Sequence, residues 1–168
     1  QEYFLSCATV NDILMRFLKK HDDLTLLPEK VAIQLNDTHP VLAIPEMMRV
    51  LIDEHRLDWD TAWHITKRTF AYTNHTILQE ALETWPVPML GAMLPRHLMI
   101  IYEINRHFMQ LIHERFPGDT GKMERMSLID ERGDKMVRMA NLAIVASYSV
   151  NGVSALHSGI LINDLFKD

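Results

Sequence analysis

Cysteine is almost absent from the sequence, and this limits both the covalent structure and the expected compartment. Cys7 is the only cysteine among 168 residues, so no disulfide can form within the chain. A chain without disulfides suits the reducing cytosol, and we therefore expect a cytoplasmic protein. Cys7 itself is expected to be a small buried hydrophobe, because free cysteine usually packs as one.

Long apolar runs and basic clusters are also missing. No stretch approaches the roughly 20 apolar residues that span a bilayer, and no signal peptide is recognisable. Lysine and arginine are dispersed, and the formal net charge is −5. Such a chain has no electrostatic reason to bind nucleic acid or an anionic membrane. The chain starts at Gln1 and stops at Asp168 just after a helical pattern, so we expect both ends to lie within a longer polypeptide.

Several motifs of known chemistry are absent. The sequence contains no phosphate-cradling glycine loop, no dinucleotide-binding glycine pattern and no serine nucleophile elbow. Glu103 and His107 have the i,i+4 spacing of half a metal site, but no third ligand lies near them in the sequence. We therefore expect no metal.

The composition that remains is that of an ordinary globular domain, with 48% hydrophobic and 23% charged residues. Apolar periodicity predicts helices over residues 3–20, 45–55, 59–69, 76–82, 95–115, 140–148 and 154–165. Short apolar runs predict strands over residues 31–35, 70–73, 127–130 and 135–139, with turns at 132–134 and 151–152. Strands that alternate with helices predict a helix-rich piece of an α/β fold, with the first two strands as parallel neighbours.

One polar pattern occurs twice. Residues 36–40 and 73–76 each follow a predicted strand, and each contains an Asn-X-Thr triplet and a histidine. Ligands of open α/β sheets bind beyond the carboxyl ends of strands, and these side chains are of the types that bind sugar hydroxyls. Two other interpretations remain open, because Asn, Asp and Thr are ordinary turn and cap formers and because both triplets are N-glycosylation acceptor sequences.

Two acidic residues follow the second copy of this pattern. Glu80 and Glu83 are three residues apart, so on a helix they share one face. They could form a catalytic carboxylate pair, but such a pair needs a specific separation across its substrate. Solvent exposure, or hydrogen bonding to hydroxyl groups, is the simpler expectation.

Several longer runs resemble α-glucan (glycogen or maltodextrin) phosphorylases. The runs occur in the order of that family and cover essentially the whole chain: residues 35–40, 72–76, 80–87, 94–98, 138–140, 150–153 and 166–168. Residues 44–49 are similar to bacterial members. The resemblance implies a single segment, residues 1–168, from the later part of a Rossmann-like N-terminal domain of the glycosyltransferase GT-B type.

The same resemblance implies an activity for the longer parent. Such an enzyme uses inorganic phosphate to release glucose 1-phosphate from an α-1,4-glucan, and it is usually a dimer. Its cofactor is pyridoxal phosphate, bound to a lysine of a C-terminal domain that this chain lacks. The isolated chain is therefore expected to be inactive. The alternative is a non-catalytic folding or assembly module that only binds glucan or self-associates.

The resemblance also implies roles for individual residues. His75 resembles the histidine that meets the glucosyl unit and stabilises an oxocarbenium-like transition state. The residues expected to contact substrate are Asp37, His39, Asn74, Thr76, Glu80, Ala81 and Glu83. A glucan storage surface is expected at Tyr102, Asn105, Glu131 and Lys135. Arg106 departs from the glutamine that is usual beside that surface.

Overall fold

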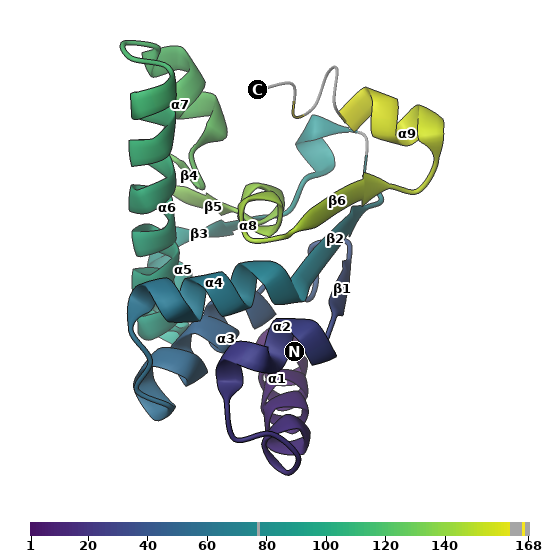
Figure 1. The fold of residues 1–168 in the computed structure, drawn as a ribbon. Coiled ribbons are helices and arrows are strands. Elements are labelled where there is room, and N and C mark those ends of the chain that lie inside the picture. The colour runs from purple at the N-terminus through teal and green to yellow at the C-terminus, as the bar shows by residue number, and fades with distance from the viewer. Residues whose placement is uncertain (77, 162–165, 167–168) are drawn as a thin grey trace.

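A computed structural model describes residues 1–76, 78–161 and 166 (Figure 1). Its helices are α1 (Glu2–Leu18), α2 (Leu27–Lys30), α3 (Ala43–Arg49), α4 (Trp59–Thr69), α5 (Val87–Met93), α6 (Pro95–Arg115), α7 (Thr120–Met126), α8 (Met139–Val145) and α9 (Ala155–Ile160). Shorter or irregular turns are η1 (Leu24–Leu26), η2 (Val50–Glu54) and η3 (Gln79–Ala81). The strands are β1 (Ile33–Asn36), β2 (Phe70–Asn74), β3 (Thr84–Pro86), β4 (Ile129–Asp130), β5 (Met136–Arg138) and β6 (Ser149–Gly152). The predicted helix-rich α/β architecture is confirmed.

The parallel sheet has the strand order β1-β2-β6. Leu35 lies opposite Tyr72, and Tyr72 lies opposite Val150 in the next strand. The prediction that the first two strands are parallel neighbours is therefore confirmed. β6 was not predicted, because its Asn-Gly pair favours a turn. Pairing with β2 overrides that local preference, and the same pairing ends α8 early, since Tyr148 N–H donates to Phe70 C=O at 2.9 Å.

The second sheet is antiparallel, with the order β3-β5-β4. The predicted turn between β4 and β5 is present, and Gly133 within it has φ 93°, which suits glycine. β3 was not predicted, because Pro86 within it favours a break in the chain. Pro86 is tolerated because β3 pairs only with β5 among the described strands, and a proline without an N–H can occupy a sheet edge. Figure 1 shows α8 between the two sheets.

Helix boundaries follow the sequence closely where a start signal and a stop signal flank a long apolar pattern. α4 and α6 begin and end as predicted, and Asp58 caps α4 by accepting a hydrogen bond from Thr61 N–H at 3.0 Å. α2, α5 and α7 were missed. Pro86 and Pro88 favour a break in the chain, although proline also fits the first turn of a helix such as α5. Of the predicted last helix, residues 162–165 lie outside the described residues.

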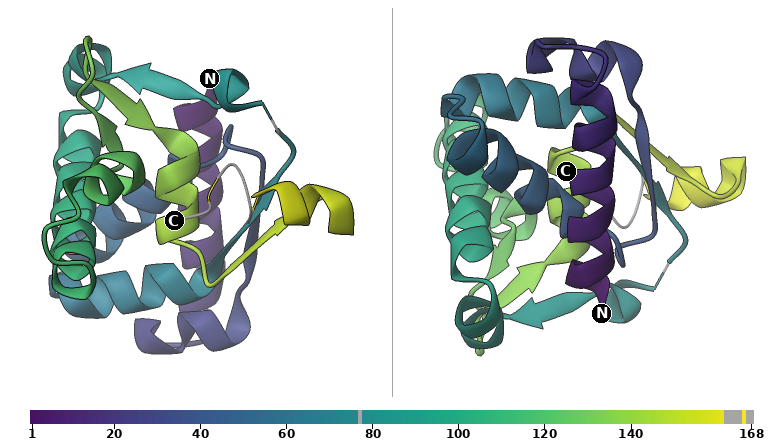
Figure 2. Two further views of the ribbon diagram at one scale, coloured as in Figure 1. Left: turned by 90° about the horizontal axis from the view of Figure 1, so that it is seen from above. Right: turned by 90° about the horizontal axis from the view of Figure 1, so that it is seen from below.

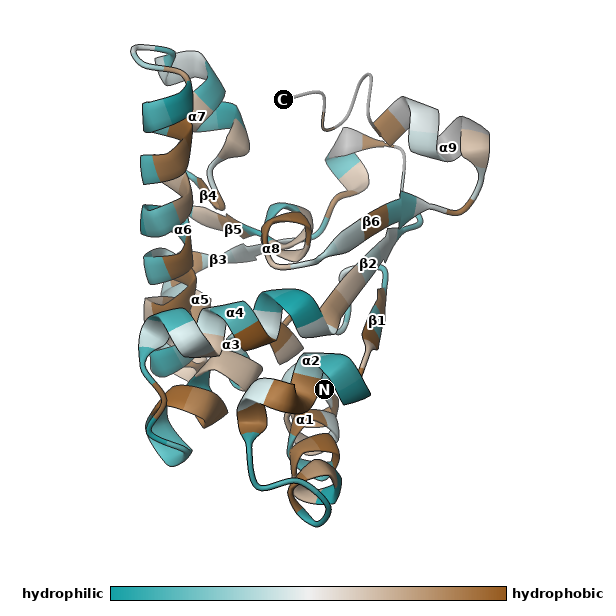
Figure 3. Cartoon of the chain, viewed as in Figure 1, coloured by the Kyte–Doolittle hydropathy of each residue, from teal (hydrophilic) through white to brown (hydrophobic). Residues whose placement is uncertain are grey.

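The core surrounds α3, in which Ile44, Met47 and Met48 are fully buried. α1 packs against α3, and Figure 2 shows α1 along one side of the molecule. α6 also packs against α3, and Figure 3 shows its hydrophobic stripe turned inward and its hydrophilic face outward. Among the described residues, no helix is both long and apolar enough to cross a membrane.

A fully buried carboxylate, Glu46, joins three helices at this core. Its two oxygens are hydrogen-bonded to side chains from all three helices: Tyr3, Cys7, Asn11, Arg49 and His97. Burial alone raises the pKa of Glu46, but the hydrogen bonds from His97, Arg49 and Cys7 outweigh burial and hold that pKa below its usual value. The expectation for Cys7 was wrong in part, because Cys7 is only half-buried and its Sγ donates to Glu46 at 3.3 Å.

Candidate functional site

The two recurring polar turns meet at the carboxyl-terminal edge of the parallel sheet. Asp37 N–H donates to Thr73 C=O at 2.9 Å, which ties the loop after β1 to the end of β2. Thr73 also accepts from Gln34 Nε2 at 2.9 Å and donates to Asn151 Oδ1 at 3.2 Å. Side-chain hydrogen bonds thus link all three parallel strands at the end where ligands of such sheets bind.

The loop after β1 is held in an uncommon backbone conformation. Asp37 has φ 60°, and its Oδ1 accepts a hydrogen bond from Thr38 N–H at 2.7 Å. Non-glycine residues adopt positive φ at an energetic cost, and Asp is among those that tolerate it best. Thr38 is buried beneath the loop, and its Oγ1 donates to Glu83 at 2.5 Å.

The loop after β2 is organised by Asn74, which is fully buried. Its Oδ1 accepts from Thr76 N–H at 2.8 Å and its Nδ2 donates to Tyr72 Oη at 2.8 Å. Burial raises the pKa of Tyr72 to about 12, so its hydroxyl stays protonated. Through these two hydrogen bonds, the buried amide of Asn74 fixes the turn that carries His75. The His75 ring is exposed, with Nε2 3.4 Å from Asn36 Oδ1.

The helix expected over residues 76–82 is wrong, and so is a helix face shared by Glu80 and Glu83. The chain forms only the short turn η3, and Glu83 lies beyond it. Glu80 and Ala81 are exposed, whereas Glu83 is half-buried and accepts hydrogen bonds from Thr38 Oγ1 and, at 2.9 Å, from Trp85 Nε1. The structure thus separates the two carboxylates into different environments and brings only Glu83 to the loop after β1.

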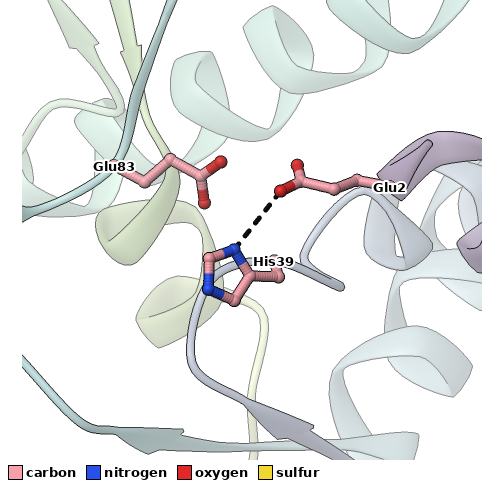
Figure 4. Close-up of side chains that lie close together, drawn as sticks. All are labelled: Glu2, His39 and Glu83. Atoms are coloured by element: carbon pink, nitrogen blue, oxygen red, sulfur yellow. Dashed lines mark hydrogen bonds and ion pairs between the residues drawn. The ribbon is translucent and has the colours of Figure 1, made fainter.

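A residue far away in the sequence completes this group. Glu2, in the first turn of α1, has Oε1 3.3 Å from His39 Nδ1, and Figure 4 shows Glu2, His39 and Glu83 pointing toward one another. Burial and the charge of Glu83 raise the pKa of Glu2, while the hydrogen bond with His39 opposes that shift. Sequence reasoning missed Glu2, because it lies 37 positions before His39 and no local spacing links them.

The expected storage residues gather elsewhere, around a pocket of about 510 Å³ beside α6 and α7. Tyr102, Asn105 and Glu131 line it, and Lys135 reaches it through an ion pair with Glu131 at 2.8 Å. The Asn105 side chain also accepts from Leu128 N–H at 2.8 Å. Arg106 is not among the residues lining the pocket, and it forms an ion pair with Glu103 at 2.6 Å.

The half metal site at Glu103 and His107 gains no third ligand within the described part of the chain. His107 Nε2 lies 3.0 Å from Glu103 Oε1, and the His107 ring stacks on Trp59 at 5.6 Å between centroids. These contacts give Glu103 and His107 a packing role at the surface of α6.

Comparison with known proteins places the whole chain in one family. A family model described as carbohydrate phosphorylase matches residues 1–168. The muscle forms of glycogen phosphorylase from Oryctolagus cuniculus and Homo sapiens are each 53% identical over 176 residues, covering 100% of this chain and 21% of the relative. The glycogen phosphorylase of Chlamydia trachomatis is 54% identical over 168 residues, again covering 100% and 21%. The chain spans about a fifth of the length of these relatives, and it belongs to the carbohydrate phosphorylase family.

Proposed function

We propose that this chain is the sugar-binding part of an α-1,4-glucan phosphorylase, a glycosyltransferase that uses inorganic phosphate to release glucose 1-phosphate from glycogen or maltodextrin. The observation that carries the proposal is the meeting of the two polar loops at the carboxyl-terminal edge of the parallel sheet. The whole-chain match to the family agrees with it. The rest of the parent chain would supply the phosphate-binding groups.

His75 is the proposed catalytic residue. Its ring is exposed beyond β2, and the turn beneath it is fixed by the buried Asn74 amide. A rigid turn holds the ring and the backbone carbonyl at a set position, which is the condition for stabilising charge that develops only in the transition state. Asn74 and Thr76 contribute to the site by shaping this turn.

The remaining sugar contacts are proposed along the neighbouring loops. Asp37, His39 and Glu83 offer carboxylate and imidazole groups near the end of β1, and Glu80 and Ala81 lie exposed within η3. Such groups bind sugar hydroxyls through hydrogen bonds of fixed direction. A storage surface is proposed at the pocket formed by Tyr102, Asn105 and Glu131, joined by Lys135.

Pyridoxal phosphate belongs to the proposed parent and not to the loops described here. Residues 36–42 and 73–86 contain no lysine, so neither loop can form a Schiff base. When bound in the parent, the cofactor would supply a phosphate group for proton transfer. The residues of this chain would bind and orient the sugar.

The decisive experiment is an assay of the full-length parent for phosphate-dependent release of glucose 1-phosphate from maltoheptaose. We expect activity in the parent and none in the isolated 168-residue chain, because transition-state contacts must be held together to accelerate the reaction. A parent that is loaded with cofactor but releases no glucose 1-phosphate would contradict the proposal.

A second candidate function is assembly. Large apolar side chains are exposed on α1, at Phe4 and Leu5, and on or beside β6, at Val150 and Tyr148. Exposed apolar groups of this size favour contact with other protein surfaces. In the parent, they would pack against the remainder of the chain or a second subunit, as in a cytoplasmic homodimer. In isolation, they would drive self-association.

A further inference from the structure

The side chains of Glu2, His39 and Glu83 converge from three separate parts of the chain. Glu2 comes from the first turn of α1, His39 from the loop between β1 and α3, and Glu83 from the segment before β3 (Figure 4). One ligand atom from each lies within 4.8 Å of the others. We propose that these three residues form a binding site for a divalent transition-metal ion of the Zn²⁺ type, which the glucan phosphorylase reaction does not require.

The distances fit a small ion. Tetrahedral Zn²⁺ with bonds of about 2.0–2.1 Å places neighbouring ligand atoms about 3.3 Å apart. His39 Nδ1 and Glu2 Oε1 are 3.3 Å apart. The widest pair of ligand atoms is within 4.8 Å, so a small rotation of the Glu2 or Glu83 side chain brings all three atoms onto one ion.

The donor types and charge also fit. One imidazole and two carboxylates match the nitrogen and oxygen ligands that Zn²⁺ and related ions accept. With the imidazole neutral, as metal binding requires, the two carboxylates carry a formal charge of about −2 that a divalent ion offsets. The ion can enter from solvent, because the His39 side chain is 72% exposed and that of Glu2 is 30% exposed.

Two hydrogen bonds from neighbouring side chains hold the carboxylate of Glu83 in place. Thr38 Oγ1 and Trp85 Nε1 donate to different oxygens of Glu83, at 2.5 and 2.9 Å. A carboxylate has about four lone-pair sites, so both bonds leave Glu83 able to bind a metal. Hydrogen bonds of this kind orient metal ligands and commonly change metal affinity by about 10- to 100-fold.

The test is direct Zn²⁺ binding by the chelator-stripped full-length protein, measured by competition with a chromogenic chelator and without substrate. Because this assay contains no substrate, a failure to bind Zn²⁺ is distinguishable from a failure of the proposed phosphorylase activity. We expect Glu2→Gln and His39→Gln each to lose one bound Zn²⁺ relative to wild type. Trp85→Phe should keep that ion but bind it roughly tenfold more weakly. The matched control, His64→Gln, changes an exposed histidine of α4 whose ring contacts Arg68, and it should bind as wild type does.

A second variant gives a signal that impaired folding cannot produce. His39→Cys replaces the imidazole with a thiolate, so added Co²⁺ should show a sulfur-to-metal charge-transfer band in addition to any that wild type shows. X-ray absorption of the wild-type Zn²⁺ complex should show nitrogen and oxygen ligands at about 2.0–2.1 Å. Equal Zn²⁺ stoichiometry and affinity in wild type and His39→Gln, or no new band in His39→Cys, would overturn the proposal.

Discussion

His75 and Glu46 show how far the surroundings of a residue decide its role. His75 is exposed just after β2 and makes little packing contact, so we expect it to contribute to binding rather than to stability. Glu46 is fully buried among donors from α1, α3 and α6, so we expect it to contribute to the stability of the fold by linking these helices. The first residue can be tested by kinetics and the second by stability.

The prediction for His75 concerns turnover. In the full-length protein, His75→Ala should lower kcat more than it raises KM, because the ring and carbonyl are proposed to act mainly in the transition state. Loss of such a contact corresponds to about 2–4 kcal/mol, or roughly 30- to 1000-fold in rate. The melting temperature, measured on the same preparation, should stay close to wild type. Normal turnover with a large fall in melting temperature would instead assign His75 to the structure of the turn.

The prediction for Glu46 concerns the free energy of unfolding. Glu46→Gln removes the charge from a buried group whose partners include Arg49 and His97, so it should destabilise the chain by about 3–5 kcal/mol in urea titrations at neutral pH. Glu54→Gln is a matched control, because Glu54 pairs with the same Arg49 but is exposed. A similar loss in both variants would show that burial is not the cause.

The same carboxylate makes stability depend on pH. Because the folded-state pKa of Glu46 lies below its unfolded value, its contribution is fully present above the unfolded pKa of about 4.3 and is lost as the pH falls through the folded pKa. Wild type should therefore lose stability on acidification below about pH 5. Glu46→Gln should show a shallower decline over that range in urea titrations, and parallel curves would contradict the linkage.

At the scale of elements, the sequence was sufficient where a local signal agreed with the final packing. Both ends of α4 and α6 were predicted, and so were β1 and β2 to within a few residues. β3 and β6 were missed because a proline and an Asn-Gly pair favour turns, and only the neighbouring strand makes them strands. The residues of the candidate site likewise fall into those that the sequence predicted and those that it missed. The two loops were predicted as a pair, whereas the contacts of Glu2 with His39 and of Thr38 with Glu83 arise only through folding, because these partners are 37 and 45 residues apart.

The cap of α4 tests whether its predicted start depends on Asp58. Asp58→Ala removes the acceptor for Thr61 N–H and should lower the free energy of unfolding by about 1 kcal/mol. Asp60→Ala is the control, since Asp60 lies in the same first turn but does not cap the helix. Chemical denaturation of both variants measures the difference, and an equal loss would indicate a charge effect of the helix end rather than a cap.

At the scale of the whole molecule, the exposed apolar residues on and beside β6 are the feature that sets the behaviour of the isolated chain. β6 pairs with β2 on one side only among the described strands, and Val150 is 41% exposed. We expect the isolated chain to self-associate with rising concentration in light scattering. Val150→Lys should reduce that association, because a lysine on an edge strand opposes pairing with another chain. Leu111→Lys, on the exposed face of α6, is the matched control, and equal reduction by both would show that β6 has no special part.

The distance along the chain between β2 and β6 sets an order of events during folding. Thr73 and Asn151, which meet across the two strands, are 78 residues apart, whereas Gln34 and Thr73 are 39 apart. Closing the longer loop costs more chain entropy and must wait for later residues to leave the ribosome. We therefore expect β1, β2 and their two polar loops to form first, with β6 joining last. Native-state hydrogen exchange should then find the amides of β6 opening more readily than those of β2.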